Sequence, residues 1–209
     1  MKVIGIVGGM GAGKSTVVAL LNEIEPISSI SADLIGHEIL RKGQPAYVPI
    51  LEAFGHDILD ASGEIVRKKL GQVVFGDEQK VRTLNEITHP LIMKSVIQKI
   101  EVSKRTMPQR HIILEAALLL ESGLVDLTDL VIAVYAAPDV RVKRVMQREG
   151  LSEAQIIKRF KAQKEWEELK AAADYVIDNS ISLEDTKKQI RCILEEIEGT
   201  CQRGEEENQ

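Results

Sequence analysis

The sequence predicts an α/β protein whose core is a parallel β-sheet. Short apolar runs alternate along the chain with longer amphipathic segments, which is typical of strands that alternate with helices. Three of the runs, Val3–Val7, Ile112–Glu115 and Leu130–Tyr135, are almost continuously apolar, as in strands buried on both faces. The 209 residues, 44% of them hydrophobic, suit a single domain with a substantial core.

Turn and cap signals delimit the expected elements. Pro138 suits the first position of a helix, where its missing N–H costs nothing, and Ser152 followed by Gln155 has the spacing of a capping box. The expected strands are residues 3–7, 27–31, 112–115, 130–135 and 175–177. The expected helices lie at about residues 14–23, 32–41, 45–53, 66–75, 78–104, 138–148, 153–172 and 183–198.

One connection in this layout is unusually long. Roughly eighty residues of helix and loop separate the second and third strands, whereas a crossover between parallel strands needs about a dozen. The spacing predicts a helical insertion at one edge of the sheet, and insertions of this kind commonly supply a substrate site.

Composition excludes several classes of function. Aromatic residues make up only 3% of the chain, too few for a protein that stacks nucleic-acid bases on aromatic side chains. The net charge of -5 requires a local basic site for any anionic ligand. No stretch is long and apolar enough for a membrane span, and the apolar opening is too short for a signal peptide. Cys192 and Cys201 have no metal-binding spacing, so we expect reduced thiols and a cytoplasmic protein without nucleic-acid or membrane partners.

A glycine-rich loop follows the first strand and matches the pattern G-x-x-x-x-G-K-[ST]. Glycines let successive backbone N–H groups surround a phosphate, and the helix that begins here directs its positive end at the anion. Lys14 would reach the β- and γ-phosphates, and the Ser15 hydroxyl would bind Mg²⁺. The alternative, a plain glycine-rich turn with an exposed lysine, has a chance of about one in fifty in this context. The expected nucleotide-binding residues of the loop are Gly8, Gly9, Gly11, Ala12, Gly13, Lys14, Ser15 and Thr16.

The rest of the chain narrows the class of nucleotide-binding protein. There is no Asn-Lys-x-Asp motif of a GTPase and no LSGGQ-like stretch of a transporter ATPase. A small-molecule kinase needs only the loop, an acidic group for the acceptor hydroxyl, and arginines that close over the transferred phosphoryl group. The sequence has all three.

Two carboxylates follow expected strands and are candidates for the chemistry. Asp33 comes after the second strand and could accept the hydroxyl proton or hold Mg²⁺ through water, or it could simply cap the next helix. Position alone leaves the functional and the capping interpretations even. Glu115 ends the third strand and could bind Mg²⁺ through water or serve as a buried structural carboxylate.

Arginines gather on one expected helix. Arg141, Arg144 and Arg148 lie at i, i+3 and i+7, on one face, and Arg159 follows after a break at Gly150. Three cations on one face repel each other unless an anion or carboxylates lie opposite, and guanidinium groups suit phosphoryl oxygens. Any one of them could be a solvated surface residue, but the cluster favours a role in binding phosphate.

Taken together, these motifs resemble those of the dephospho-CoA kinase family over nearly the whole chain. The marks are residues 8–16, Ser31-Ala32-Asp33 with His37, Thr88-His89-Pro90-Leu91-Ile92, Glu115-Ala116-Ala117-Leu118-Leu119, Glu121-Ser122-Gly123, the arginine helix, Arg159 with Gln163, and residues 173–179. The resemblance implies ATP-dependent phosphorylation of the 3′-hydroxyl of dephospho-CoA, with ATP and Mg²⁺ as cofactors. It also implies a fold similar to nucleoside monophosphate kinases: a three-layer sandwich with a five-stranded parallel sheet, a helical CoA-binding region and a lid.

The resemblance assigns roles to particular residues. Asp33, Lys14 and Arg144 are expected to be catalytic, Arg144 and Arg148 to contact ATP, and Ser15 and Glu115 to bind the metal. The expected acceptor-binding residues are Asp33, His37, His89, Leu118 and Arg159. The single domain divides into a core (about 1–36, 108–138 and 173–200), a helical region (about 37–107) and a lid (about 139–172).

The chain departs from the family pattern in two places. Ser31 stands where the family usually has the first Asp of Asp-x-Asp, and Ala117 stands where it often has Pro. The first change means that Ser31 must act through water or that Glu115 takes a larger share of the metal. Ser31 also permits a second function, an ATP-binding regulator without turnover. Another small-molecule or nucleotide kinase is a further alternative, which acceptor preference would decide.

Overall fold

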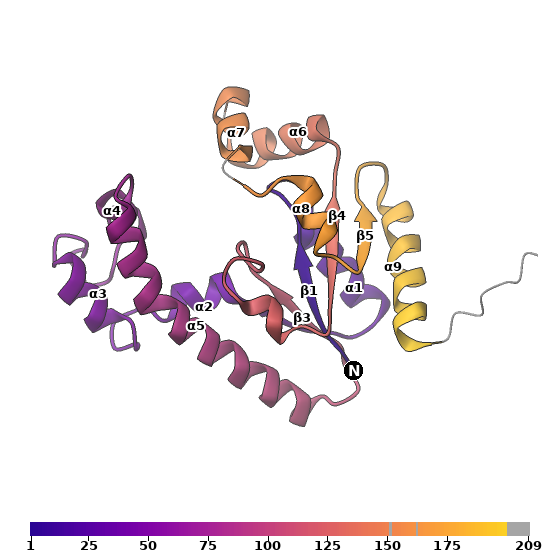
Figure 1. Cartoon of the computed structure of the whole chain (residues 1–209), viewed down its shortest axis with the longest axis horizontal. Helices are drawn as coiled ribbons and strands as arrows, with labels where there is room; N and C mark the ends of the chain where they lie inside the picture. Colours follow the sequence, from indigo (N-terminus) through magenta and orange to yellow (C-terminus); the bar gives the residue numbers. More distant parts are fainter. Residues whose placement is uncertain (151, 162, 200–209) are drawn as a thin grey trace, which may run out of the picture.

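The structure is a computed structural model that describes residues 1–150, 152–161 and 163–199. Its centre is a five-stranded, all-parallel sheet in the order β2-β3-β1-β4-β5 (Figure 1). The strands are β1 (Val3–Val7), β2 (Ser28–Ser31), β3 (Ile112–Glu115), β4 (Leu130–Tyr135) and β5 (Tyr175–Asp178). The predicted α/β class and the parallel sheet are confirmed, and the predicted strand bounds differ only by one residue in β2 and in β5.

Alternating side chains of the central strands serve two separate cores. Val3 and Val7 of β1 point into one hydrophobic cluster, whereas Ile4 and Ile6 point into the other. All four are almost completely buried, so β1 is covered on both faces, as its continuous apolar sequence predicts.

Helices cover both faces of the sheet and complete a three-layer sandwich. On one face lie α1 (Lys14–Ile24) and α9 (Leu183–Glu198), which pack against each other and against the cluster containing Ile4 and Ile6. On the other face lie α2 (Ala32–Glu38) and the long α5 (Glu78–Thr106), whose Val96 and Ile100 join the cluster containing Val3 and Val7. The carboxyl end of β1, where the glycine-rich loop begins, is therefore held by helices on both faces of the sheet.

The predicted helical insertion lies between β2 and β3. It comprises α2, α3 (Tyr47–Phe54), α4 (Arg67–Val74) and α5, and Figure 1 shows α3 and α4 at the end of α5 that is remote from the sheet. Pro90 lies inside α5, and the helix continues through it. Ile50, Ile58 and Leu70 are buried, so the insertion has apolar packing of its own that continues into the main core.

The prediction of one helix over residues 153–172 is wrong. After α6 (Pro138–Glu149) the chain forms two short helices, α7 (Glu153–Phe160) and α8 (Trp166–Ala171). Ser152 and Gln155 form the predicted capping box of α7, and a second box between Glu165 and Glu168 starts α8. Three other helices are shorter than predicted: α2 ends at Glu38, α3 begins at Tyr47, and α4 spans only Arg67–Val74. A 3₁₀ helix at Leu124–Leu127 was not anticipated.

The described part of the chain bears on the predictions about membrane spans and cysteines. None of its helices has the length and apolar character that crossing a bilayer requires. Cys192 is exposed on α9, and Cys201 lies outside the described residues.

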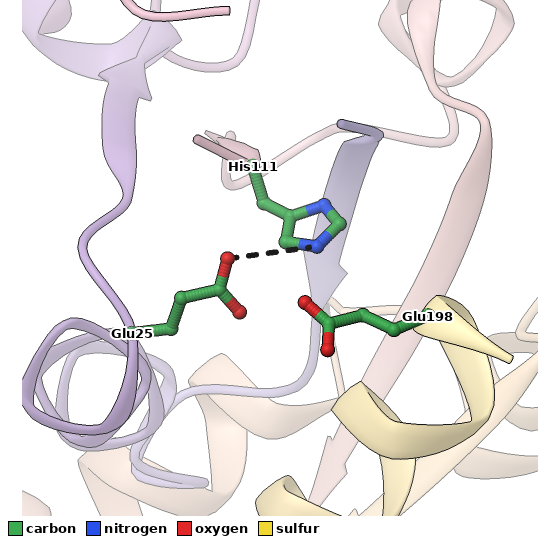
Figure 2. A group of neighbouring side chains, drawn as sticks. All are labelled: Glu25, His111 and Glu198. Atoms are coloured by element: carbon green, nitrogen blue, oxygen red, sulfur yellow. Dashed lines mark ion pairs between the residues drawn. The ribbon is translucent and has the colours of Figure 1, made fainter. Parts of the chain in front are cut away.

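A histidine and two glutamates meet at the end of the sheet opposite the glycine-rich loop (Figure 2). His111 is buried just before β3; its Nδ1 accepts a hydrogen bond of 3.0 Å from the Lys2 amide, and its Nε2 faces Glu25 at 3.8 Å. Glu198, at the end of α9, is the third member. Because Nδ1 is an acceptor, a neutral His111 carries its proton on Nε2, the nitrogen that faces the carboxylates. The group is therefore arranged for polar contacts that hold the N-terminal strand, and a metal on Nε2 would have to displace that proton.

Candidate functional site

The glycine-rich loop connects β1 to α1 at the carboxyl edge of the sheet. Three of its glycines, Gly8, Gly11 and Gly13, have φ angles of 152°, 80° and 92°, which other residues rarely adopt. A Cβ at Gly13 would lie 2.1 Å from Nδ2 of Asn179, so glycine is required there by space as well as by backbone angle.

The start of α1 is suited to a phosphate group. Its first backbone hydrogen bond runs from the Val17 amide to the Gly13 carbonyl (3.0 Å), which leaves the amides of the first turn without partners inside the helix. Gly13 is the N-cap and has no side chain to occupy these amides, and no acidic residue lies in the first turn. The N-terminus of α1 therefore offers an anion its first-turn N–H donors and the positive end of the helix.

Lys14 connects the loop to the two candidate carboxylates. Its Nζ donates to the carbonyl oxygen of Gly8, within the loop itself. Burial lowers the pKa of Lys14, and the negative charges of Asp33 and Glu115 act in the opposite direction. The structure thus brings together the three charged groups that the sequence predicts at this edge.

Asp33 does not cap α2. The N-cap is Ser31, whose hydroxyl accepts a hydrogen bond of 3.3 Å from the Leu34 amide, so the capping interpretation of Asp33 is wrong. Asp33 is exposed in the first turn, and its Oδ1 accepts a bond of 3.3 Å from the Ala117 amide. This leaves the carboxylate facing the space between α2 and the end of β3, with capacity for further hydrogen bonds.

Glu115 ends β3, beside the end of β2. Its carboxylate accepts a hydrogen bond of 3.2 Å from Ser29 and is half-buried. Ser15, the other predicted metal ligand, is exposed at the start of α1. Mg²⁺ prefers hydroxyl and carboxylate oxygens as ligands, so Ser15 and Glu115 are chemically suited to bind this ion.

Asp33 lines two adjoining hollows. The larger, which we call the acceptor cavity, has a volume of about 590 Å³ and lies between α2, the start of α4 and α5; among its lining residues are Asp33, His37, Arg67, Asn85 and Thr88. The smaller, of about 150 Å³, is lined by Asp33, His89 and Leu118 among others. Three of the predicted acceptor-binding residues, His37, His89 and Leu118, are therefore placed next to Asp33.

The predicted arginine cluster divides into two groups. Arg144 lies against the loop, where its guanidinium donates to the carbonyls of Ala12 (3.4 Å) and Asn179 (2.9 Å). Arg148 and Arg159 instead both pair with Glu149, Arg159 at 2.8 Å. The described structure places Arg159 outside the lining of the acceptor cavity.

Comparison with protein families decides between the remaining kinases. The family described as dephospho-CoA kinase matches residues 2–185, which is most of the chain. The chain belongs to the dephospho-CoA kinase family.

Individual relatives agree with this membership of the dephospho-CoA kinase family. The chain is 44% identical over 197 residues to a dephospho-CoA kinase of Aquifex aeolicus, covering 94% of this chain and 98% of that protein. It is 40% identical over 193 residues to one of Bacillus licheniformis, covering 92% and 95%. The structure of TT1252 from Thermus thermophilus superposes with a TM-score of 0.79 at 30% identity, over 93% of this chain and 97% of that one.

Several contacts around the loop of this dephospho-CoA kinase family member could not be predicted from its motifs. The side chain of Asn179, after β5, donates to the Ala12 carbonyl at 2.9 Å, and that of Gln163 accepts from the Met10 amide at 2.9 Å. Both residues belong to segments that mark the resemblance, but nothing local indicates that they touch the loop. Arg67 of the acceptor cavity had no motif to reveal it, because only the fold places α4 near α2.

Proposed function

We propose that this chain transfers the γ-phosphoryl group of ATP to the 3′-hydroxyl of dephospho-CoA, giving coenzyme A and ADP. The observation that carries the proposal is the position of Asp33, which lines the acceptor cavity and acts electrostatically on the loop lysine, Lys14. A hydroxyl held in that cavity can meet both a carboxylate and a phosphoryl group bound at the loop. Membership of the dephospho-CoA kinase family supplies the identity of the acceptor.

The loop residues would hold the ATP phosphates. The open amides at the start of α1 would donate to phosphate oxygens, and Lys14 would exchange its bond with the Gly8 carbonyl for one with the β- and γ-phosphates. Gly9 and Thr16 would complete the contacts predicted for Gly8, Gly11, Ala12, Gly13 and Ser15.

Ser15 and Glu115 would hold Mg²⁺, Ser15 directly and Glu115 through water. Bound Mg²⁺ would offset negative charge on the phosphates. The Ser31 hydroxyl already caps α2. Glu115 is therefore the better candidate for the metal binding that the first Asp of the family motif would contribute.

Asp33 would act as the proton acceptor. In the transfer, the 3′-oxygen forms a bond to the γ-phosphorus while the bond from that phosphorus to the β–γ bridging oxygen breaks, and the hydroxyl proton passes to the Asp33 carboxylate. Lys14, Arg144 and Arg148 would stabilise the charge of the transferred group. His37, His89 and Leu118 would position the acceptor.

Arg148 and Arg159 would contribute from the lid. Both now share Glu149, so each would reach a ligand only by exchanging that ion pair. We assign residues 139–172 to the lid, 37–107 to acceptor binding and the remainder to the core, in a cytoplasmic enzyme.

A phosphotransfer assay with a panel of acceptors tests this function. We expect ADP release with dephospho-CoA and little turnover with nucleoside monophosphates or shikimate. The opposite preference would assign the chain another acceptor. ATP binding measured by calorimetry without transfer to any acceptor would indicate a nucleotide-binding regulator.

A further inference from the structure

One cation in the acceptor cavity has no part in the chemistry proposed above. Arg67 is the first residue of α4, is exposed, and lines the cavity together with Asp33 and His37. Within the part of the chain that the structure describes, no hydrogen bond or ion pair is found for its side chain. An arginine without a carboxylate partner, at the wall of a hollow of about 590 Å³, is available to a ligand.

Part of the wall of the acceptor cavity is formed by α2. Asp33 and His37 are four residues apart on this helix and therefore lie on the same face, about one turn or about 6 Å apart along the axis. His37 and Arg67 both line the acceptor cavity, and the positive charge of Arg67 is the second cause, after burial, that lowers the pKa of His37. The lining of the cavity thus contains the carboxylate of Asp33, the imidazole of His37 one helical turn away, and the guanidinium of Arg67.

This arrangement matches the charge distribution of the acceptor. Dephospho-CoA carries its reacting 3′-hydroxyl on a ribose, and the 5′-side of the same ribose bears the diphosphate that leads to the pantetheine arm. With the hydroxyl at Asp33, the diphosphate lies about one sugar away, within reach of the cavity that His37 and Arg67 also line. The planar guanidinium can donate two parallel hydrogen bonds to phosphate oxygens.

We propose that Arg67 binds the diphosphate of the acceptor and thereby selects nucleosides that carry a 5′-diphosphate and sets the position of their 3′-hydroxyl. This inference rests on the proposed function, because it takes dephospho-CoA as the acceptor. Arg67 is a specificity residue that touches the substrate away from the reacting atoms.

Steady-state kinetics of Arg67→Gln test the assignment, with two acceptors varied at saturating ATP and ATP varied at saturating dephospho-CoA. The acceptors are dephospho-CoA and adenosine, which has the 3′-hydroxyl and no diphosphate. Loss of a charge-assisted contact predicts a KM for dephospho-CoA that is about 10- to 100-fold higher. The KM for ATP and the kcat/KM for adenosine should stay within about twofold, and Arg67→Lys should recover part of the loss. Lys68→Gln, the adjacent exposed cation, is the matched control and should change neither value.

Two results would overturn the assignment. One is an Arg67→Gln enzyme whose KM for dephospho-CoA equals that of Lys68→Gln. The other is an equal loss with both acceptors, which would mean that Arg67 acts on Asp33 or on the fold.

A calorimetric titration of dephospho-CoA without ATP separates this inference from the proposed function. The affinity of the Arg67→Gln protein should be about 10- to 100-fold weaker than that of the unchanged chain. An unchanged chain that binds dephospho-CoA in this way but does not phosphorylate it would refute the proposed function and retain the contact.

Discussion

Nε of Arg141 donates a hydrogen bond of 2.9 Å to the carbonyl oxygen of Met10, at the apex of the phosphate-binding loop. The same guanidinium contacts Gln163 (3.4 Å), which accepts from the Met10 amide, and it lies over the ring of Phe160 at 4.0 Å. A Cβ on Gly9 would come within 2.4 Å of it. The loop apex is therefore held by the segment that forms α6 and α7.

Removing this contact should weaken nucleotide binding. Arg141→Ala takes away a charge-assisted hydrogen bond, so we expect the loop to lose its fixed geometry and the Kd for ATP to rise about 10-fold. Isothermal titration calorimetry measures this Kd. Lys143→Ala, which removes an exposed cation of the same helix, should leave the Kd unchanged. Equal ATP affinity in both variants would mean that the contact does not shape the loop.

Replacing the proposed proton acceptor should separate turnover from binding. Asp33→Asn keeps the shape of the side chain but cannot take up the hydroxyl proton, so kcat should fall by about 100-fold or more. The Kd for ATP should change by less than about threefold, because Asp33 is in the acceptor cavity and not in the loop. Glu38→Gln at the exposed end of the same helix is the control. If kcat hardly changes, another group accepts the proton.

Asn179 should matter for stability and nucleotide binding together. Its buried side chain donates to the Ala12 carbonyl and accepts from Thr186 at 3.1 Å. Asn179→Ala should lower the free energy of unfolding by about 1–3 kcal/mol in urea denaturation and weaken ATP binding. Ile181→Ala, two residues further on at a side chain that is 80% exposed, should do neither.

His37 should make acceptor binding depend on pH. Burial first and then the charge of Arg67 lower the pKa of His37 below its ordinary 6.5, and the charge of Asp33 acts in the other direction. The imidazole is therefore mostly neutral in the free protein at neutral pH. A bound diphosphate raises this pKa, so binding takes up a proton and tightens as the pH falls.

We expect the KM for dephospho-CoA to decrease between about pH 8 and about pH 6. His37→Asn should flatten this dependence without changing the KM for ATP. A KM that rises over the same interval in the unchanged enzyme would contradict the assignment.

The central strands were the most predictable part of the fold. The bounds of β1, β3 and β4 follow from their continuous apolar sequences, because these strands are buried on both faces. The edge strands β2 and β5 carry polar residues such as Ser29 and Asp178, so their ends are less distinct. The division between α7 and α8 depends on a cap formed by glutamates at 165 and 168, a pattern that also suits the interior of a helix.

The parts of the candidate site that lie within a single sequence motif were predictable. The loop, Asp33 and Glu115 follow directly from strand ends and glycine spacing. The partners of Met10 and Ala12 are 153 and 167 residues away in sequence, and only the folded chain reveals them. The ion pair of Arg148 with Glu149 was not predictable either, because helical spacing alone places Arg148 on the same face as Arg144.

The bond between Asn179 and Ala12 has a consequence for the order of events during synthesis. The loop at residues 8–16 is made long before Asn179, whose side chain secures it and which directly follows the last strand of the sheet. A nascent chain that ends before residue 179 has the complete glycine-rich motif and lacks this support. Tight nucleotide binding should therefore arise late in translation, after β5 has joined β4.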